Sequence, residues 1–260
     1  MDTAKRYGVE QYLGQAIKDS GVNRDDIFLT TKLWPKDYGI ISTRKAAFES
    51  MKRLDTDYLD MYMLHFPGCP SYINNEKEVL QDTWRELELL LDSERVRSIG
   101  VSNFSISDLE NLVSEETSGL WPHVNQLEFH PYQHNKALIK YLDYYDIQFG
   151  GYCPLAKGRI LNEVPVQKVA KMVGKSPAQV LIRWSIQHNA LTIPKSTKKH
   201  RVMENIKSLD FELPNAAMTI LDELHSNLRV VDLDGVRQRL EQDMPDGYKM
   251  KNSHCILPKF

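Results

Sequence analysis

The feature that most constrains the fold is an alternation of two kinds of segment along most of the chain. Short runs of apolar, β-branched and aromatic residues, typical of buried strands, alternate with longer segments whose apolar residues recur at helical spacing. The strands are expected at residues 27–33, 57–65, 97–101, 124–129, 147–152 and 191–193. Because a helical segment follows each strand, neighbouring strands should be parallel and joined by right-handed crossovers.

The expected helices occupy the intervals between these strands and one segment before the first of them. They lie at residues 8–19, 42–54, 75–95, 105–114, 136–145, 164–173, 176–188, 199–207 and 214–227. The last residues, 228–260, have little periodic pattern and are expected to form a C-terminal loop or tail. No break in composition divides the chain, which predicts one domain over 1–260 with its core at 2–227.

Two α/β layouts could produce this alternation, a closed (β/α)8 barrel and an open doubly wound sheet. The open sheet predicts a glycine-rich phosphate turn after an early strand, and the sequence contains no G-x-G-x-x-G. The barrel is therefore favoured. Since a complete barrel has eight strands, six strands predict a TIM barrel lacking its first strand, its first helix and most of its second strand.

Composition narrows the possible partners and the compartment. The 33 Lys and Arg residues against 35 Asp and Glu residues give a net charge of -2, which argues against binding to nucleic acid or to an anionic membrane surface. The three cysteines, Cys69, Cys153 and Cys255, are widely spaced and predict neither a disulfide framework nor a metal site. No run approaches the ~20 apolar residues of a membrane helix, so a cytoplasmic protein is expected.

Polar residues at or near the ends of the expected strands are the candidates for chemistry. In a parallel α/β barrel the carboxyl ends of the strands form one mouth, so Lys32 and His65 should face the same space, together with Asp2 and Tyr7. A phenol titrates near pH ~10, and a neighbouring ammonium lowers that pKa by favouring the phenolate. Lys32 could supply the ammonium, Asp2 could keep it protonated, and a neutral His65 could orient a carbonyl oxygen. Such a site suits proton delivery to a carbonyl as hydride reaches its carbon.

Several motifs resemble those of the aldo-keto reductase family. They are Asp2-Thr3-Ala4 with Tyr7, TTKLW at 30–34, DYLD at 57–60 leading to LHFP at 64–67, RSIGVSNF at 97–104 and IPKSTKKHRVMEN at 193–205. The similarity extends from residue 2 to about residue 227. It implies a (β/α)8 barrel that reduces aldehydes or ketones with NADPH, with Tyr7 as the general acid, Lys32 and Asp2 tuning it, and His65 orienting the substrate.

The resemblance also implies a cofactor site. Ser102, Asn103 and Gln126 would bind the nicotinamide carboxamide, and Tyr152, in a loop that continues to Leu155, would stack on its ring. Further along the chain, the resemblance implies that Lys195, Ser196 and Arg201 bind the 2′-phosphate of the cofactor. Glu204 and Asn205 would lie near its adenine. A helix N-terminus after Lys195 also favours an anion.

Two readings remain open for the large aromatic residues that directly follow the strand ends. Trp34 and Phe66 either wall the substrate, as the resemblance implies, or pack in the core. The activity itself also has an alternative: a truncated, catalytically weak splice form or gene-model fragment that at most binds nucleotide or a partner. The expected partner is a small-molecule carbonyl substrate; the sequence specifies neither which carbonyl compound it is nor the oligomeric state.

Overall fold

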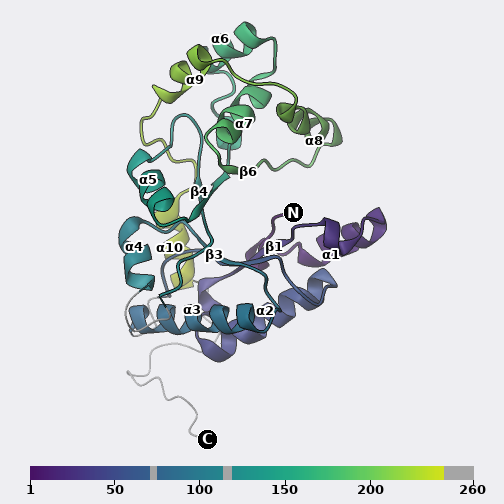
Figure 1. Cartoon of the computed structure of the whole chain (residues 1–260), viewed down its shortest axis with the longest axis vertical. Coiled ribbons are helices and arrows are strands. Elements are labelled where there is room, and N and C mark those ends of the chain that lie inside the picture. Colours follow the sequence, from purple (N-terminus) through teal and green to yellow (C-terminus); the bar gives the residue numbers. More distant parts are fainter. Residues whose placement is uncertain (71–74, 114–118, 243–260) are drawn as a thin grey trace, which may run out of the picture. The chain divides into compact units, whose positions relative to one another are not determined.

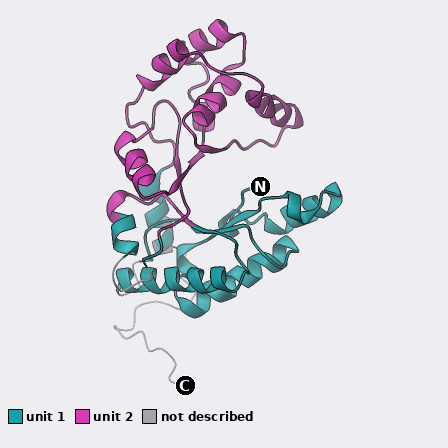
Figure 2. Ribbon diagram, in the orientation of Figure 1, with its two compact units in different colours: residues 1–99, 108–120, 232–260 teal, residues 100–107, 121–231 magenta. Residues whose placement is uncertain are grey.

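The structure is a computed structural model that describes residues 1–70, 75–113 and 119–242. Figure 2 shows the two compact units into which the chain separates. Unit 1 comprises residues 1–99, 108–120 and 232–260, and unit 2 comprises residues 100–107 and 121–231. Cys255, most of the expected tail and residue 114 of an expected helix lie outside the described residues. The single-domain prediction stays a prediction.

Six strands follow one another in chain order, and β1, β3, β4 and β6 are labelled in Figure 1. They are β1 (Thr30–Leu33), β2 (Met61–Leu64), β3 (Ile99–Ser102), β4 (Val124–Glu128), β5 (Gln148–Tyr152) and β6 (Leu191–Ile193). The pairs β1–β2, β3–β4, β4–β5 and β5–β6 are parallel. The α/β class with six parallel strands, as predicted from the alternation of segments, is confirmed.

The helices fall where helical periodicity placed them, with one addition. They are α1 (Glu10–Ser20), α2 (Ile40–Leu54), α3 (Glu76–Asp92), α4 (Ile106–Leu112), α5 (Lys136–Tyr144), α6 (Val164–Val173), α7 (Pro177–Gln187), α8 (Lys199–Ile206), α9 (Asn215–Asp222) and α10 (Leu233–Gln242). Helix α10 corrects the expectation that the tail has no regular structure. Its Leu233, Val236 and Leu240 recur at helical spacing and pack against buried aromatic residues of unit 1.

Unit 1 places the first residues of the chain beside β1. The amide of Thr30 donates to the carbonyl of Met1 at 2.8 Å, and the amide of Thr3 donates to the carbonyl of Thr30 at 2.9 Å. Asp2 lies between them in a parallel bridge to Thr30. Backbone hydrogen bonds on both sides of Asp2 therefore fix the direction in which its carboxylate leaves the backbone.

Unit 2 contains two glycines that allow close packing beside β4. A Cβ atom at Gly150 would lie 3.1 Å from Cγ of Gln126, and one at Gly151 would lie 3.3 Å from Cβ of Phe129. Glycine therefore lets the Gln126 side chain lie against the backbone of β5. In the same unit, Ser176 and Gln179 form a capping box that begins α7.

Over the residues that the structure describes, no helix has both the length and the apolar character needed to cross a membrane.

Candidate active site

A buried ion pair stands at the end of β1. Lys32 is fully buried in β1, and its Nζ atom donates to Oδ1 of Asp2 at 2.5 Å and to the backbone carbonyl of Thr3 at 3.1 Å. Burying an ammonium without partners is unfavourable, and these two acceptors offset the free-energy cost of burying Lys32. Both come from the residues that pair alongside β1.

Tyr7 and His65 meet next to this pair. His65 follows β2, and its backbone amide donates to the carbonyl of Leu33 at 3.0 Å, which holds it against β1. The hydroxyl of Tyr7 lies 3.5 Å from Nε2 of His65, and Nζ of Lys32 lies 5.6 Å from the centroid of the Tyr7 ring. Tyr7 itself is 52% exposed. The four predicted residues thus come together in unit 1, with the phenol accessible from outside.

Burial and charge fix the protonation state of His65. The pKa of His65 is lowered to about 3, first by burial and then by the positive charges of Lys32 and Arg6. The imidazole is therefore neutral at physiological pH and can donate one hydrogen bond while its other nitrogen stays unprotonated. Burial also lowers the pKa of Lys32, whereas the Asp2 carboxylate opposes that shift.

The predicted substrate-wall residues are both buried. Trp34 and Phe66 form a cluster with Leu240 of α10, and the Trp34 ring meets His65 edge-on with 5.2 Å between ring centroids. The indole Nε1 of Trp34 is buried and has no hydrogen-bond partner among the described residues. Trp34 and Phe66 therefore do pack in a core, and their contact with substrate stays a prediction.

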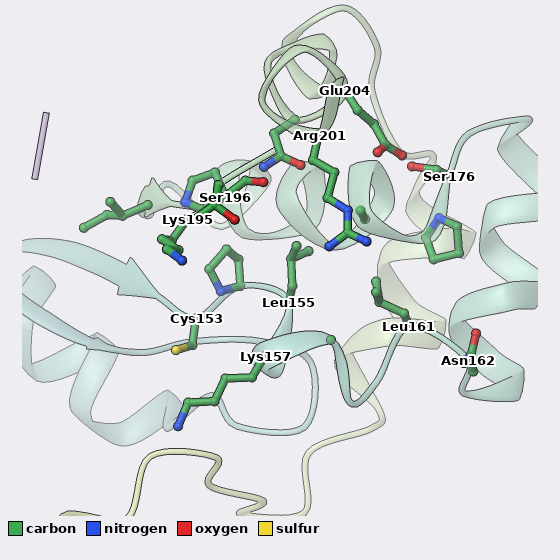
Figure 3. Close-up of a pocket in the computed structure, with 18 of the residues that line it drawn as sticks. Cys153, Leu155, Lys157, Leu161, Asn162, Ser176, Lys195, Ser196, Arg201 and Glu204 are labelled. Atoms are coloured by element: carbon green, nitrogen blue, oxygen red, sulfur yellow. The ribbon is translucent and has the colours of Figure 1, made fainter. Parts of the chain in front are cut away.

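In unit 2 a pocket of about 830 Å³ gathers six of the predicted cofactor residues. These are Leu155, Lys195, Ser196, Arg201, Glu204 and Asn205. Figure 3 shows the Arg201 guanidinium projecting toward the middle of the pocket, with Lys195 and Ser196 on the segment after β6. Because two cations and a hydroxyl line the pocket, it suits a phosphate group.

The loop after β5 forms another wall of this pocket and has an unusual backbone. Cys153, Ala156 and Lys157 all have positive φ angles, of 52°, 46° and 56°. Non-glycine residues in this region are uncommon and gather at ligand clamps. The Nζ atom of Lys157 donates to the carbonyl of Val230 at 2.8 Å, and in Figure 3 its side chain extends away from Arg201.

The residues predicted to bind the carboxamide do not line this pocket but form a hydrogen-bonded group in the same unit. Tyr152 donates to Oδ1 of Asn103 at 2.6 Å, and Nδ2 of Asn103 donates to Oγ of Ser102 at 3.1 Å. Ser102 in turn donates to the backbone carbonyl of Gln126 at 2.9 Å. Tyr152 immediately precedes Cys153, which does line the pocket.

Sequence reasoning missed several pocket residues and one buried carboxylate. The pocket is also lined by Leu161, Asn162, Gln167 and Ser176, which carry no motif of their own. The capping pattern from Ser176 to Gln179 was the only signal that could have drawn attention to one of them. The carboxylate is that of Glu128, which ends β4, is buried and accepts from the backbone amides of Val230 and Val231. Its position at a strand end gives no sign of these partners, which come from a distant segment.

Within the described ranges no group of three or more His, Cys, Asp or Glu side chains could hold a metal ion.

Comparison with known proteins identifies the family. The sequence model of the Aldo/keto reductase family matches residues 1–226. This chain belongs to that family. The aldo-keto reductase is 49% identical over 260 residues to an uncharacterized oxidoreductase of Caenorhabditis elegans, covering 100% of this chain and 79% of the relative. It is 41% identical over 230 residues to glyoxal reductase of Bacillus subtilis, covering 88% of this chain and 80% of the relative.

Solved structures show the same relationship. A Bombyx mori aldo-keto reductase, solved in complex with NADP, superposes on this aldo-keto reductase with a TM-score of 0.82 and 30% identity. The match covers 94% of this chain and 82% of the other. The resemblance read from the motifs is therefore confirmed, and the protein is an oxidoreductase of this family.

Proposed function

We propose that this aldo-keto reductase reduces aldehydes or ketones to alcohols with NADPH, and that Tyr7 is the general acid. The observation that carries the proposal is the contact of the Tyr7 hydroxyl with Nε2 of His65 at 3.5 Å, beside the buried pair of Lys32 and Asp2. A phenol that can release a proton, a neutral imidazole that can orient the carbonyl and an ammonium that can stabilise the phenolate together suit proton delivery to a carbonyl oxygen.

The residues of the pocket fit NADPH. Lys195, Ser196 and Arg201 offer two cationic donors and a hydroxyl, which suit the 2′-phosphate, and Glu204 with Asn205 offer polar groups for the adenine. The Bombyx mori relative was solved with NADP, which supports the choice of cofactor. When bound, the reduced nicotinamide supplies the hydride.

The remaining steps follow from the chain's own side chains. His65 donates from Nε2 to the carbonyl oxygen and orients it toward Tyr7. Tyr7 releases its hydroxyl proton to that oxygen as negative charge develops there. The Lys32 ammonium stabilises the phenolate that remains, and Asp2 keeps Lys32 protonated against the effect of burial. The cytoplasmic location predicted from composition stays a prediction.

Turnover and binding can be measured separately. Loss of NADPH absorbance is followed with glyoxal, since one relative is a glyoxal reductase, and with a series of larger aldehydes and ketones. In parallel, thermal unfolding is followed with and without NADPH, which at a hundredfold excess over Kd should stabilise the protein by about 2.7 kcal/mol. The proposal predicts both turnover and stabilisation. Stabilisation without turnover on any carbonyl would instead indicate the catalytically weak, nucleotide-binding alternative.

A further inference from the structure

We propose that the short 3-10 helix η3 (Pro35–Asp37) holds the two groups of the proton transfer at their working distance, through the side chains of Asp37 and Tyr38. These two groups are the hydroxyl of Tyr7 and Nε2 of His65, which lie 3.5 Å apart. Asp37 and Tyr38 are thus positioning residues, each acting through a catalytic residue and not on the substrate. This inference rests on the proposed function and deepens it by naming what sets the geometry of its site.

The hydroxyl of Tyr38 holds the backbone next to His65. Tyr38 is buried, and its hydroxyl donates to the carbonyl of Phe66 at 2.6 Å, one residue after His65. Burial raises the pKa of this hydroxyl well above its ordinary value, so it stays protonated and remains a donor. Phe66 is buried as well, so loss of the donor would leave its carbonyl short of a partner, and the backbone beside His65 would shift. At the other end of η3, the Trp34 ring meets the His65 ring edge-on.

Asp37 reaches the segment that carries Tyr7. That segment is the 3-10 helix η1 (Lys5–Tyr7), and Nζ of Lys5 lies 2.9 Å from Oδ2 of Asp37. The two side chains are only 21% and 19% exposed, so water screens this ion pair less than it screens one on the open surface. The amide of Tyr7 donates to the carbonyl of Ala4 at 3.0 Å, which closes the turn. A displacement of Lys5 would therefore move Tyr7 with it.

The turn that makes both contacts is itself tied to two helices of unit 1. Oγ of Ser42, on α2, donates to the carbonyl of Tyr38 at 2.8 Å. The amide of Gly39 donates to Oγ1 of Thr83, on α3, also at 2.8 Å. Within the turn, the amide of Tyr38 donates to the carbonyl of Pro35 at 3.2 Å. A turn anchored in this way can fix the position of η1 relative to the chain after β2.

The consequence concerns the chemical step. The hydroxyl of Tyr7 and Nε2 of His65 have to reach the same carbonyl oxygen, and a misplacement of about 1 Å can slow a reaction about a hundredfold. Loss of either contact of η3 should therefore slow proton delivery. Binding of NADPH should stay as it is, because the pocket proposed for its phosphate and adenine is formed by unit 2, whereas η3 belongs to unit 1.

The test measures the single-turnover rate of aldehyde reduction and Kd for NADPH in Tyr38→Phe and Asp37→Asn. Tyr62→Phe is the matched control for the first variant. Tyr62 is a buried tyrosine of the same unit, and its hydroxyl has no hydrogen-bond partner among the described residues. Glu49→Gln is the control for the second variant. It also removes an acidic partner of Lys5, at 3.6 Å, but it lies on α2 and leaves the contact with η3 intact.

Double variants separate positioning from a general effect on stability. Tyr38→Phe is combined with His65→Gln, and Asp37→Asn is combined with Tyr7→Phe. A residue that acts through its catalytic partner has nothing left to position once that partner is removed. A merely structural role would instead lower the rate further in both backgrounds, in step with the loss of folded protein.

Tyr38→Phe and Asp37→Asn should each lower the rate about ten- to hundredfold with Kd for NADPH unchanged, and both controls should keep the unmodified rate. Neither variant should lower the rate further in its double variant. An unchanged rate in either variant, an equal loss in its control or a further loss in its double variant would overturn the inference. Should Tyr38→Phe fail to fold, Asp37→Asn decides the question by the same criteria. If the unmodified protein reduced no carbonyl compound, the proposed function itself would fail, and the inference with it.

Discussion

The Nζ atom of Lys32 lies 2.5 Å from Oδ1 of Asp2, although the two residues are 30 positions apart in the sequence. Asp2 reaches this position because Met1 and Thr3 pair with Thr30 of β1. The ion pair therefore depends on two short backbone contacts, and the charge that the proposed mechanism places near Tyr7 depends on the ion pair.

Asp2→Asn should shift the pH dependence of carbonyl reduction. Burial lowers the pKa of Lys32 and the Asp2 carboxylate raises it, so removing the carboxylate lowers this pKa further. Lys32 then loses its proton at a lower pH, and the fall in kcat on the alkaline side should move to lower pH. Asp19→Asn, an exposed change on α1, is the control and should leave the profile in place. An unshifted profile in Asp2→Asn would show that Asp2 does not control the pKa of Lys32.

His65 should make stability depend on pH in the acid range. Its pKa is about 3 in the folded protein and 6.5 ordinarily, so below pH 6.5 the unfolded chain binds a proton that the folded protein does not. The free energy of unfolding should fall from pH 6.5 toward pH 3, by up to about 1.4 kcal/mol per pH unit. Urea unfolding of His65→Gln should lack this component, whereas the exposed control His123→Gln should keep it. Equal slopes in both variants would contradict the neutral, buried imidazole.

Arg201→Ala should distinguish the two nicotinamide cofactors. A charge-assisted hydrogen bond to the 2′-phosphate is worth about 1.5–3 kcal/mol, so Kd for NADPH should rise about ten- to hundredfold. Kd for NADH, which lacks this phosphate, should stay unchanged. Lys199→Ala, on the same helix α8 but outside the pocket lining, should leave both constants as they are. Equal weakening of NADPH and NADH would argue that Arg201 contacts another part of the cofactor.

Local pattern was enough to predict most elements of this fold. Strand β6 and helix α6 were predicted at their observed bounds, because apolar spacing and flanking residues decide both locally. Helix α10 was missed although Leu233, Val236 and Leu240 have helical spacing, because the charged residues around them lower the mean hydropathy. Its partners, Trp34 and Phe66, lie in a distant part of the sequence, and no local pattern reports such a contact.

Only part of the candidate site could be predicted from the sequence. The strand-end rule grouped Lys32 with His65, since it depends only on topology. The chain of hydrogen bonds from Tyr152 to Gln126 depends on rotamers and on the left-handed backbone of Asn103, which residue types alone do not determine. The same holds for Glu128, whose role is set by the segment that folds onto it.

Glu128→Gln should destabilise the protein. The carboxylate is buried and accepts from the amides of Val230 at 2.7 Å and Val231 at 2.9 Å, while Nε2 of His130 lies 3.0 Å away. Burial opposes ionisation, yet these hydrogen bonds hold the pKa of Glu128 below its ordinary value. Its contribution is therefore present above pH 4.5 and lost as the pH falls through the lowered pKa.

A glutamine at this position would set one N–H group against a backbone donor, which should lower the free energy of unfolding by about 1–3 kcal/mol at neutral pH. Urea unfolding measures this change. The control is Glu212→Gln, whose side chain is 81% exposed and should alter stability little. A loss no larger than that of Glu212→Gln would show that the carboxylate does not hold the segment at Val230 and Val231.

The most direct test of the account is the single-turnover rate of aldehyde reduction by Tyr7→Phe, measured together with Kd for NADPH. The account predicts a rate at least about a hundredfold lower, because the phenyl ring has no proton to deliver, with Kd for NADPH unchanged. A Tyr7→Phe variant that reduced the aldehyde at the unmodified rate would contradict the assignment of Tyr7 as the general acid.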